Sequence, residues 1–138
     1  MTVTEMKDPY KGVIPYVCVS DAKAASKLYE KALGAEIIDT RAVDDGRLIH
    51  CEMLINGSAM MINDPFPEHG MSETGVGSCT LHITVDDLQE WWDRAIGAGF
   101  ISVMEPHDAF WGDRYAMMRD EYGLKWALVG PKESVEAT

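Results

Sequence analysis

Residues 13–35 read VIPYVCVSDAKAASKLYEKALGA, and residues 79–100 read CTLHITVDDLQEWWDRAIGAGF. Each stretch opens with a short apolar run that predicts a buried strand and continues with apolar residues at helical spacing. Ser20 or Asp21 can cap the first helix, and Asp86 can cap the second. Gly34 is expected to end the first helix, and Gly97 or Gly99 the second. Both stretches therefore predict a strand that leads directly into a helix.

Three further strands are expected after each helix. They are short apolar runs between turn signals such as Asp44-Asp45-Gly46 and Asn56-Gly57. Their predicted ranges are 35–41, 48–55 and 59–63 in the first half, and 101–104, 114–119 and 124–129 in the second. The order strand, helix, strand, strand, strand thus occurs twice.

The two halves keep a common spacing. Gly46 and Gly112 are 66 positions apart, as are Gly57 and Gly123, which is the signature of a duplicated unit. The prediction is an α+β fold with two tandem βαβββ units, whose curved mixed sheets surround a cleft suited to a ligand. A chain of 138 residues is expected to form a single domain over 1–138, with units at 12–64 and 78–130 and a linker loop at 65–77.

Composition restricts the partners. With 12 basic and 23 acidic residues the net charge is −11, which disfavours nucleic acid and anionic membranes and attracts cationic ligands, or serves only solubility. Cys18, Cys51 and Cys79 form no Cys-x-x-Cys pair and are interpreted as reduced thiols. No signal peptide or membrane-spanning run is recognised, so we predict a cytoplasmic location.

Four segments carry a resemblance to a known family: PYVCVSD at 15–21, LYEKALGA at 28–35, GRLIHCE at 46–52 and FWGDR at 110–114. They resemble the vicinal oxygen chelate superfamily of glyoxalase I, bleomycin resistance proteins and extradiol dioxygenases, and most of all its PhnB-like branch. The resemblance covers residues 12–130. It implies a homodimer that binds a small molecule.

The resemblance also implies where a metal would be held. Metal-dependent members take one ligand from the first and last strand of each unit, and these positions correspond to Ile14, Met61, Thr80 and Ala127. None is His, Asp or Glu, the residues that bind divalent ions in such sites. We therefore expect no metal and no cofactor, and not a metal-dependent glyoxalase I.

Three polar residues are candidates for catalysis. His50 and Glu52 are two apart on one predicted strand, so their side chains face the same side. Together with His82 they could form a general acid/base set or a relocated metal site. Alternatively, His50 and Glu52 lie on a solvated face or bond each other, and His82 is a core histidine with its hydrogen bonds satisfied.

A second set of residues is interpreted as lining a ligand site. Phe110 and Trp111 follow a Pro-His-Asp loop and could wall a pocket, and methionines suit permissive binding surfaces. Arg114 could anchor a carboxylate or phosphonate, or pair with a neighbouring acid. The complete predicted set is Tyr16, Met61, His82, Phe110, Trp111, Arg114 and Met118. Ordinary core and dimer packing is the competing interpretation of the methionines.

Two main functional hypotheses follow. The first is a metal-independent small-molecule-binding protein of the glyoxalase/bleomycin resistance type, which sequesters an antibiotic or toxic metabolite that is cationic or aromatic. The alternative is an enzyme of the lyase, isomerase or dioxygenase type with a relocated site at His50, Glu52 and His82. A scaffold protein without a small ligand is a third possibility.

Overall fold

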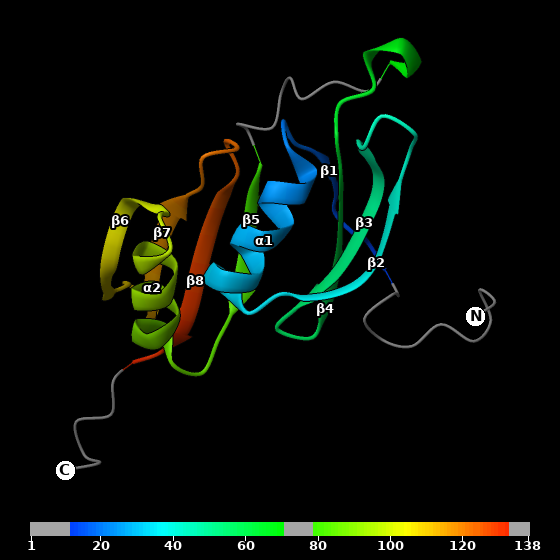
Figure 1. Ribbon diagram of the computed structural model, residues 1–138. Coiled ribbons are helices and arrows are strands. Elements are labelled where there is room, and N and C mark those ends of the chain that lie inside the picture. Colours follow the sequence, from blue (N-terminus) through cyan, green and yellow to red (C-terminus); the bar gives the residue numbers. More distant parts are fainter. Residues whose placement is uncertain (1–11, 71–78, 133–138) are drawn as a thin grey trace. The chain divides into compact units, whose positions relative to one another are not determined.

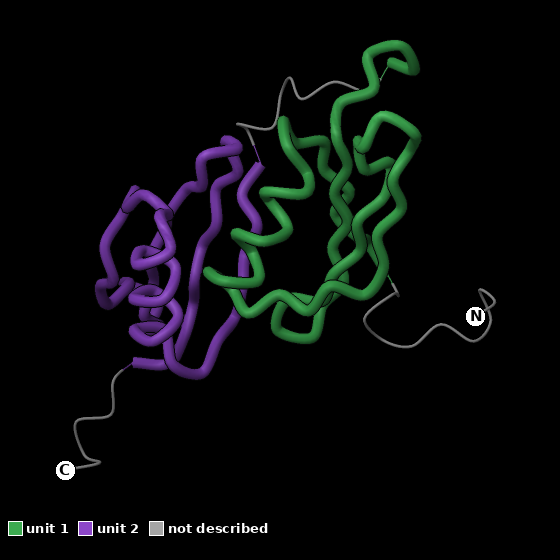
Figure 2. The backbone as a smooth tube through the Cα atoms, in the orientation of Figure 1, with its two compact units in different colours: residues 1–75 green, residues 76–138 purple. Residues whose placement is uncertain are grey.

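The structure, a computed structural model, describes residues 12–70 and 79–132. The chain divides into two compact units, residues 1–75 and 76–138 (Figure 2). Each unit contains a mixed four-stranded sheet and one α-helix, which confirms the predicted α+β class and the two βαβββ units. The predictions for residues 1–11, for residues 71–77 of the linker loop and for residue 78 lie outside the described residues.

Unit 1 has the strand order β1-β4-β3-β2, in which β1 and β4 are parallel and the other pairs antiparallel. Figure 1 shows α1 lying along one face of this sheet. The elements and their bounds are β1 (Tyr16–Cys18), α1 (Ala22–Leu33), β2 (Glu36–Ala42), β3 (Leu48–Ile55), β4 (Ser58–Asn63) and the 3₁₀ helix η3 (Pro67–His69). The predicted first strand, 13–19, is shortened to three residues. Pro15 precedes it and contributes a carbonyl that accepts from the Met61 amide.

Unit 2 repeats this arrangement with the order β5-β8-β7-β6. Its elements are β5 (Thr80–Thr84), α2 (Leu88–Gly97), β6 (Ile101–Asp108), β7 (Asp113–Arg119) and β8 (Lys125–Pro131). The helix cap is Asp87 and not Asp86, because the Asp87 carboxylate accepts from the Glu90 amide at 3.1 Å. Strand β6 continues to Asp108, past the point where the sequence predicts a loop. It is an edge strand with a register shift around Pro106, where a proline is tolerated.

Local signals explain the bounds of α1. The Asp21 carboxylate accepts from the Ala24 amide at 3.0 Å and caps the first turn. Gly34 adopts the left-handed conformation, with φ 66°, and so ends the helix as predicted. Between these two residues the buried positions recur at helical spacing: Ala22, Ala25, Ser26, Tyr29, Ala32 and Leu33.

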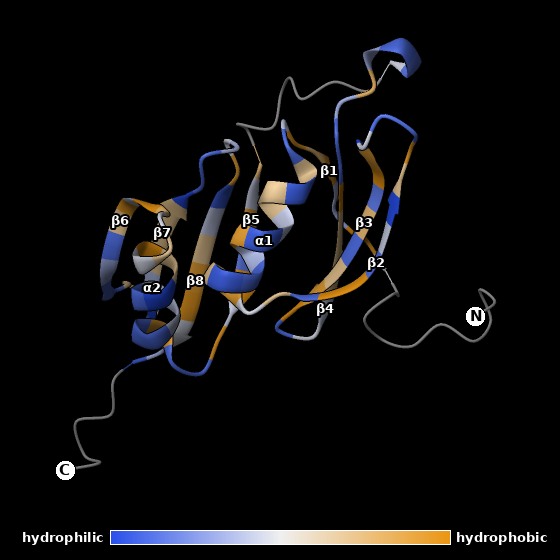
Figure 3. Cartoon of the chain, in the orientation of Figure 1, coloured by the Kyte–Doolittle hydropathy of each residue, from blue (hydrophilic) through white to orange (hydrophobic). Residues whose placement is uncertain are grey.

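Each unit buries one face of its sheet under its own helix. In β3 the buried residues Cys51 and Met53 alternate with half-buried ones, and in β7 Ala116 and Met118 do the same. Figure 3 shows hydrophobic and hydrophilic residues alternating along the strands in this way. Trp126 is buried in the core of unit 2. The opposite, helix-free face of each sheet therefore carries the more accessible side chains.

The internal repeat is visible in the strand register. Tyr16 pairs with Met61 across β1 and β4, and His82 pairs with Ala127 across β5 and β8. The first strands of the two units, β1 and β5, and the last, β4 and β8, are therefore 66 residues apart. The third strands depart from this spacing. Cys51 on β3 pairs with Ile62, and Ala116 on β7 pairs with Leu128, the equivalent of Ile62. Strands β3 and β7 are therefore 65 residues apart.

Candidate functional site

The helix-free face of the unit 1 sheet presents one continuous cross-strand row. Tyr16 on β1 pairs with Met61 on β4, Met61 pairs with Glu52 on β3, and Glu52 pairs with Asp39 on β2. Because directly opposite residues share a face, this row combines an aromatic, a thioether and two carboxylate side chains. His50 lies on the same face, two residues before Glu52.

Three polar side chains on this face lie next to one another. His50 Nε2 is 3.3 Å from Glu52 Oε1, and His50 Nδ1 is 3.5 Å from the Tyr16 hydroxyl. The Tyr16 hydroxyl donates to the Ile49 carbonyl oxygen at 3.0 Å, and burial raises the pKa of this phenol. An imidazole placed between a carboxylate and a phenol can accept a proton at one nitrogen and release one at the other. The group can therefore act as a general acid/base set.

The helix-free face of the unit 2 sheet is aromatic and apolar. The Tyr115 ring lies edge-on to His82, His107 and Trp111, with centroid distances of 6.4, 6.0 and 5.6 Å. Phe110 extends this cluster, with its ring 5.0 Å from that of Trp111. Edge-on contacts of this kind leave ring faces available to a further partner.

These aromatic residues are unusually accessible. Phe110 is 97% exposed and Trp111 51% exposed, and the methionine Met104 on the neighbouring edge strand is also exposed. Met104 pairs with Met117, which adds a second thioether on the same face. A contiguous apolar patch of this kind on a protein surface is typical of a binding site. We call Met104, Phe110, Trp111, Tyr115 and Met117 the aromatic patch.

Two of the residues predicted to bind ligand lie elsewhere. Met118 is 0% exposed and packs on the helix side of the sheet, where it pairs with Trp126. Arg114 lies on that same helix side, because it alternates with Tyr115 and is two residues from buried Ala116. The predicted residues that lie in unit 2 are thus divided between the two faces of its sheet, while Tyr16 and Met61 lie in unit 1.

Met117 and Tyr115 were not among the predicted site residues. The 66-residue spacing makes Met118 the equivalent of Glu52 in unit 2. The strand pairing gives a spacing of 65 for these strands, so the true equivalent is Met117. A shift of one residue moves every side chain of a strand to the other face. The signal that identifies Met117 is the alternation of burial along β7, which the sequence alone does not resolve.

The four positions that correspond to the family's metal ligands do not fit a divalent ion. Met61 and Ala127 lie opposite Tyr16 and His82 in their sheets, and together with Ile14 and Thr80 they offer no carboxylate and no imidazole. Among residues 12–70 and 79–132, no three or more His, Cys, Asp or Glu side chains gather closely enough to hold a metal. His50 and Glu52 belong to unit 1, and His82 belongs to unit 2.

Two hollows lie on the helix sides of the sheets. One of about 470 Å³ in unit 1 is bordered by α1 and β2, with Lys23, Lys27 and Ile37 among its lining residues. The other, about 340 Å³ in unit 2, is bordered by the start of α2 and the ends of β7 and β8, and it includes Arg114. Across the described parts of the chain, no helix is long and apolar enough to span a membrane.

Comparison with known proteins identifies the class. The family model of the Glyoxalase/Bleomycin resistance protein/Dioxygenase superfamily matches residues 13–128. The chain belongs to this superfamily, as its sequence predicts.

Individual proteins are similar to this chain in sequence or in fold. The uncharacterized protein Mb0911c of Mycobacterium bovis is 36% identical over 127 residues, which cover 88% of this chain and 84% of that protein. The crystal structure of TioX from Micromonospora sp. ML1 shares the fold with a TM-score of 0.71 at 19% identity, covering 91% of this chain and 99% of TioX. The fosfomycin resistance protein FosX of Listeria monocytogenes has a TM-score of 0.66 at 15% identity, covering 93% of this chain and 98% of FosX.

Proposed function

We propose that this chain is a metal-independent small-molecule-binding protein whose ligand has an aromatic or cationic part. The observation that carries the proposal is the aromatic patch on the helix-free face of unit 2, where Phe110 and Trp111 are largely exposed. Covering such a surface with a ligand is favourable, because apolar area is removed from water.

The chemistry of the patch favours a particular kind of ligand. The faces of Trp and Tyr attract planar aromatic groups and cations, and the two methionines adapt to ligands of different shape. A net charge of −11 further attracts a cation from a distance. His82 and His107, which lie edge-on to Tyr115, supply polar nitrogens at the border of the patch.

The biological role that we propose is sequestration of an antibiotic or toxic metabolite by a cytoplasmic homodimer. FosX, which has the same fold, is named as a fosfomycin resistance protein. The residues at the family's metal positions favour binding without a metal. Tyr16 and Met61 on the helix-free face of unit 1 are proposed to bind a ligand at their own sheet.

Fluorescence of Trp111 gives a direct test. Ethidium, berberine and bleomycin are titrated into the full chain, and both Trp emission and melting temperature are recorded. We expect at least one of these probes to quench the emission and raise the melting temperature by mass action. Trp111→Phe is expected to lose the quenching. Trp91→Phe is the matched control, because Trp91 is half-buried on α2, and it should keep the quenching.

Two results would contradict this proposal. One is the absence of stabilisation by every probe, which favours a scaffold without a small ligand. The other is unchanged affinity when Trp111 and Tyr115 are both replaced by alanine. Stoichiometric metal in the purified protein, lost on His82→Ala or Glu52→Gln, would refute metal independence in particular.

The arrangement of Tyr16, His50 and Glu52 favours a second candidate, an enzyme of the lyase, isomerase or dioxygenase type. Of the steps in such reactions, the one that these groups can perform themselves is proton transfer at a carbon acid, as in a lyase or isomerase. The test is deuterium incorporation into small 2-oxo acids in D₂O, followed by NMR. We expect incorporation that His50→Gln abolishes and His69→Gln leaves unchanged. Incorporation at the uncatalysed rate with every acid would remove this candidate.

A further inference from the structure

Strand β6 carries a bulge next to the aromatic patch. Met104 on β6 pairs with Met117 on β7, and His107 pairs with Tyr115. Three steps along β6 thus correspond to two steps along β7, so β6 contains one extra residue here. Without this bulge, Pro106 would lie opposite Tyr115. The bulge therefore brings an imidazole, and not a proline ring, to the border of the aromatic patch.

The side-chain hydrogen bond of His107 determines its tautomer. His107 Nδ1 lies 2.8 Å from the Glu105 carbonyl oxygen. A carbonyl oxygen can only accept, so Nδ1 carries the hydrogen and donates it. In a neutral imidazole the other nitrogen, Nε2, then has no hydrogen and is an acceptor. His107 therefore offers one acceptor nitrogen, at the outer end of its ring.

This acceptor is unused within the described parts of the chain. Among residues 12–70 and 79–132, none donates a hydrogen bond to His107 Nε2, and the residue is exposed. The His107 ring lies edge-on to Tyr115 at 6.0 Å, and Tyr115 lies edge-on to Trp111 at 5.6 Å. A ligand of two fused rings that covers Trp111 and Tyr115 therefore ends close to the imidazole.

The surroundings of this acceptor favour a donor that carries a positive charge. The faces of Trp111 and Tyr115 attract cations, and so does the net charge of −11. An ammonium group with an N–H can meet the ring faces and also donate a charge-assisted hydrogen bond to Nε2. A quaternary ammonium group meets the ring faces alone. Because it has no N–H, it leaves the acceptor that it covers without a partner.

We propose that the aromatic patch binds protonated aromatic amines, with His107 Nε2 accepting an N–H of the ammonium group. His107 thereby determines specificity, because it separates N–H cations from quaternary ones. This inference rests on the proposed function, since it concerns the same patch. His82 supplies a matched control. It lies edge-on to Tyr115 at 6.4 Å, and it has no side-chain hydrogen bond to a described residue that would select its tautomer.

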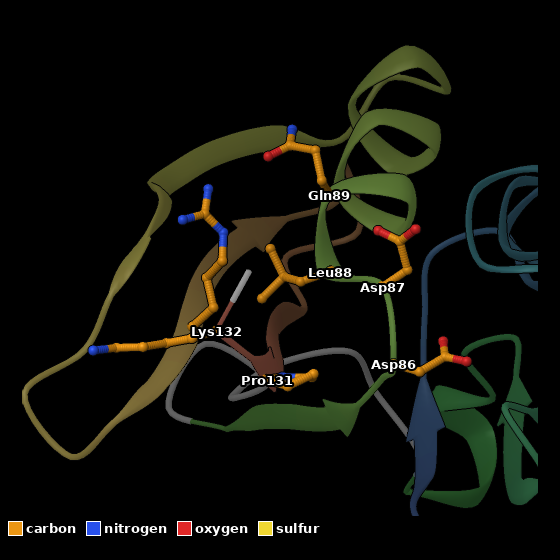
Figure 4. A pocket seen from close by; sticks show the side chains of 7 residues that line it. Asp86, Asp87, Leu88, Gln89, Pro131 and Lys132 are labelled. Atoms are coloured by element: carbon orange, nitrogen blue, oxygen red, sulfur yellow. The ribbon is translucent and has the colours of Figure 1, made fainter. Parts of the chain in front are cut away.

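The acids on the helix side of unit 2 are a competing place for a cation. Asp86 and Asp87 line the hollow of about 340 Å³ at the start of α2, and Figure 4 shows both carboxylates there. Carboxylates also accept from an ammonium group, so a preference for N–H cations does not by itself identify His107. Leu88 and Gln89 line the same hollow, and their amide signals report binding there.

NMR of the full ¹⁵N-labelled chain at pH 8 tests the tautomer and the specificity. Long-range ¹H–¹⁵N spectra distinguish the two imidazole nitrogens, and we expect His107 to carry its hydrogen on Nδ1. The probes are 2-(1-naphthyl)ethylamine and its N,N,N-trimethyl derivative. We expect both to shift the amide signals of Trp111 and Tyr115 with saturation, and the amine to bind at least about fivefold more tightly.

The possible failures of this experiment are distinguishable. A hydrogen on His107 Nε2, or equal affinities for the two probes, would overturn the inference alone. Shifts confined to Leu88 and Gln89 would place the probes in the hollow and overturn it as well. No saturable shift with either probe would contradict the proposed function, and the inference with it.

Variants assign the preference to one imidazole. His107→Phe keeps an aromatic ring next to Tyr115 and removes both nitrogens. It should weaken binding of the amine about fivefold or more and leave binding of the trimethyl probe within about twofold. His82→Phe on β5 makes the same change on the other side of Tyr115 and should keep the preference for the amine. A His107→Phe variant with the full preference, or a His82→Phe variant without it, would contradict the proposal.

Discussion

Asp120, which directly follows β7, provides the sharpest test of how unit 2 is held together. Its side chain is 1% exposed, and it accepts from the Tyr122 amide at 2.9 Å, the Leu124 amide at 3.1 Å and Trp126 Nε1 at 3.0 Å. One carboxylate thus fixes both the β7–β8 turn and the indole of the core. Removing it takes this acceptor away from all three donors.

The cost of removal can be estimated from these contacts. A buried donor left without an acceptor costs about 1–3 kcal/mol. Because Tyr122 is half-buried and water can reach its amide, the count rests on Leu124 and Trp126. We expect Asp120→Ala to lower the free energy of unfolding by about 2–6 kcal/mol, a large part of the roughly 5–15 kcal/mol typical of a domain.

Asp120→Asn should be milder. Its amide oxygen can keep the two turn bonds, while its NH₂ group meets the N–H of Trp126, so about 1–3 kcal/mol is lost. In a Trp126→Phe background the same substitution should cost less, because the indole donor is gone. Urea denaturation followed by far-UV circular dichroism measures all of these changes.

The control for Asp120 is its neighbour. Glu121→Ala removes an exposed acid from the same turn and should change stability by less than about 0.5 kcal/mol. The reasoning would be refuted if Asp120→Ala matched this control, or if Asp120→Asn cost as much with Phe at position 126 as with Trp.

Three further expectations concern single side chains. Burial, and secondarily the charge of a nearby acid, raises the pKa of the Cys51 thiol. This residue should therefore react with iodoacetamide far more slowly at neutral pH than the exposed Cys79. Mass spectrometry of the labelled peptides measures both rates, and equal rates would contradict the burial. The hydrogen bond from Arg47 lowers the pKa of Glu68 from 4.5 to about 2. Their ion pair is therefore complete above pH 4.5 and is lost as the pH falls through about 2. A ¹³C NMR titration should give a Glu68 pKa of about 2, and Arg47→Gln should return this pKa towards 4.5. Asp64→Ala should lower the free energy of unfolding by about 2–6 kcal/mol, since two buried backbone amides lose their acceptor. A change below about 0.5 kcal/mol in urea denaturation would refute that role.

Where two local signals coincide, the sequence predicts an element accurately. The predicted start and end of α1 are confirmed, since the Asp21 cap and Gly34 act within a few residues of the chain. The predicted range of β3, 48–55, is likewise confirmed between its two turns. Strand β6 is underestimated because almost all of its residues are exposed. An edge strand of this kind has no alternation of apolar and polar residues from which to predict it.

The candidate site was predictable only where it depends on spacing along one strand. His50 and Glu52 are two residues apart on β3, and the structure brings their side chains into contact. The edge-on contacts of Tyr115 depend instead on the pairing of β6 and β7, whose register includes shifts that no sequence motif marks. The exchange of Met118 for Met117 has the same origin, since a single residue of register decides which side chain reaches the helix-free face.

The two units use one backbone plan but fill it differently, which explains why their hollows lie at different places. Ser26 of α1 and Trp92 of α2 are 66 positions apart, and both are almost buried, at 7% and 8% exposed. The Trp92 indole fills the middle of the helix–sheet groove in unit 2, whereas Ser26 leaves the hollow of about 470 Å³ beside α1. At the helix start the two units differ again. The Asp64 carboxylate of unit 1 accepts from the Ala22 and Leu48 amides, whereas the backbone of unit 2 lies so close to Gly130 that a Cβ there would be 3.0 Å from the Val85 carbonyl oxygen. Side chains of different volume at equivalent positions can therefore place the hollows of a duplicated fold at different depths of the same groove.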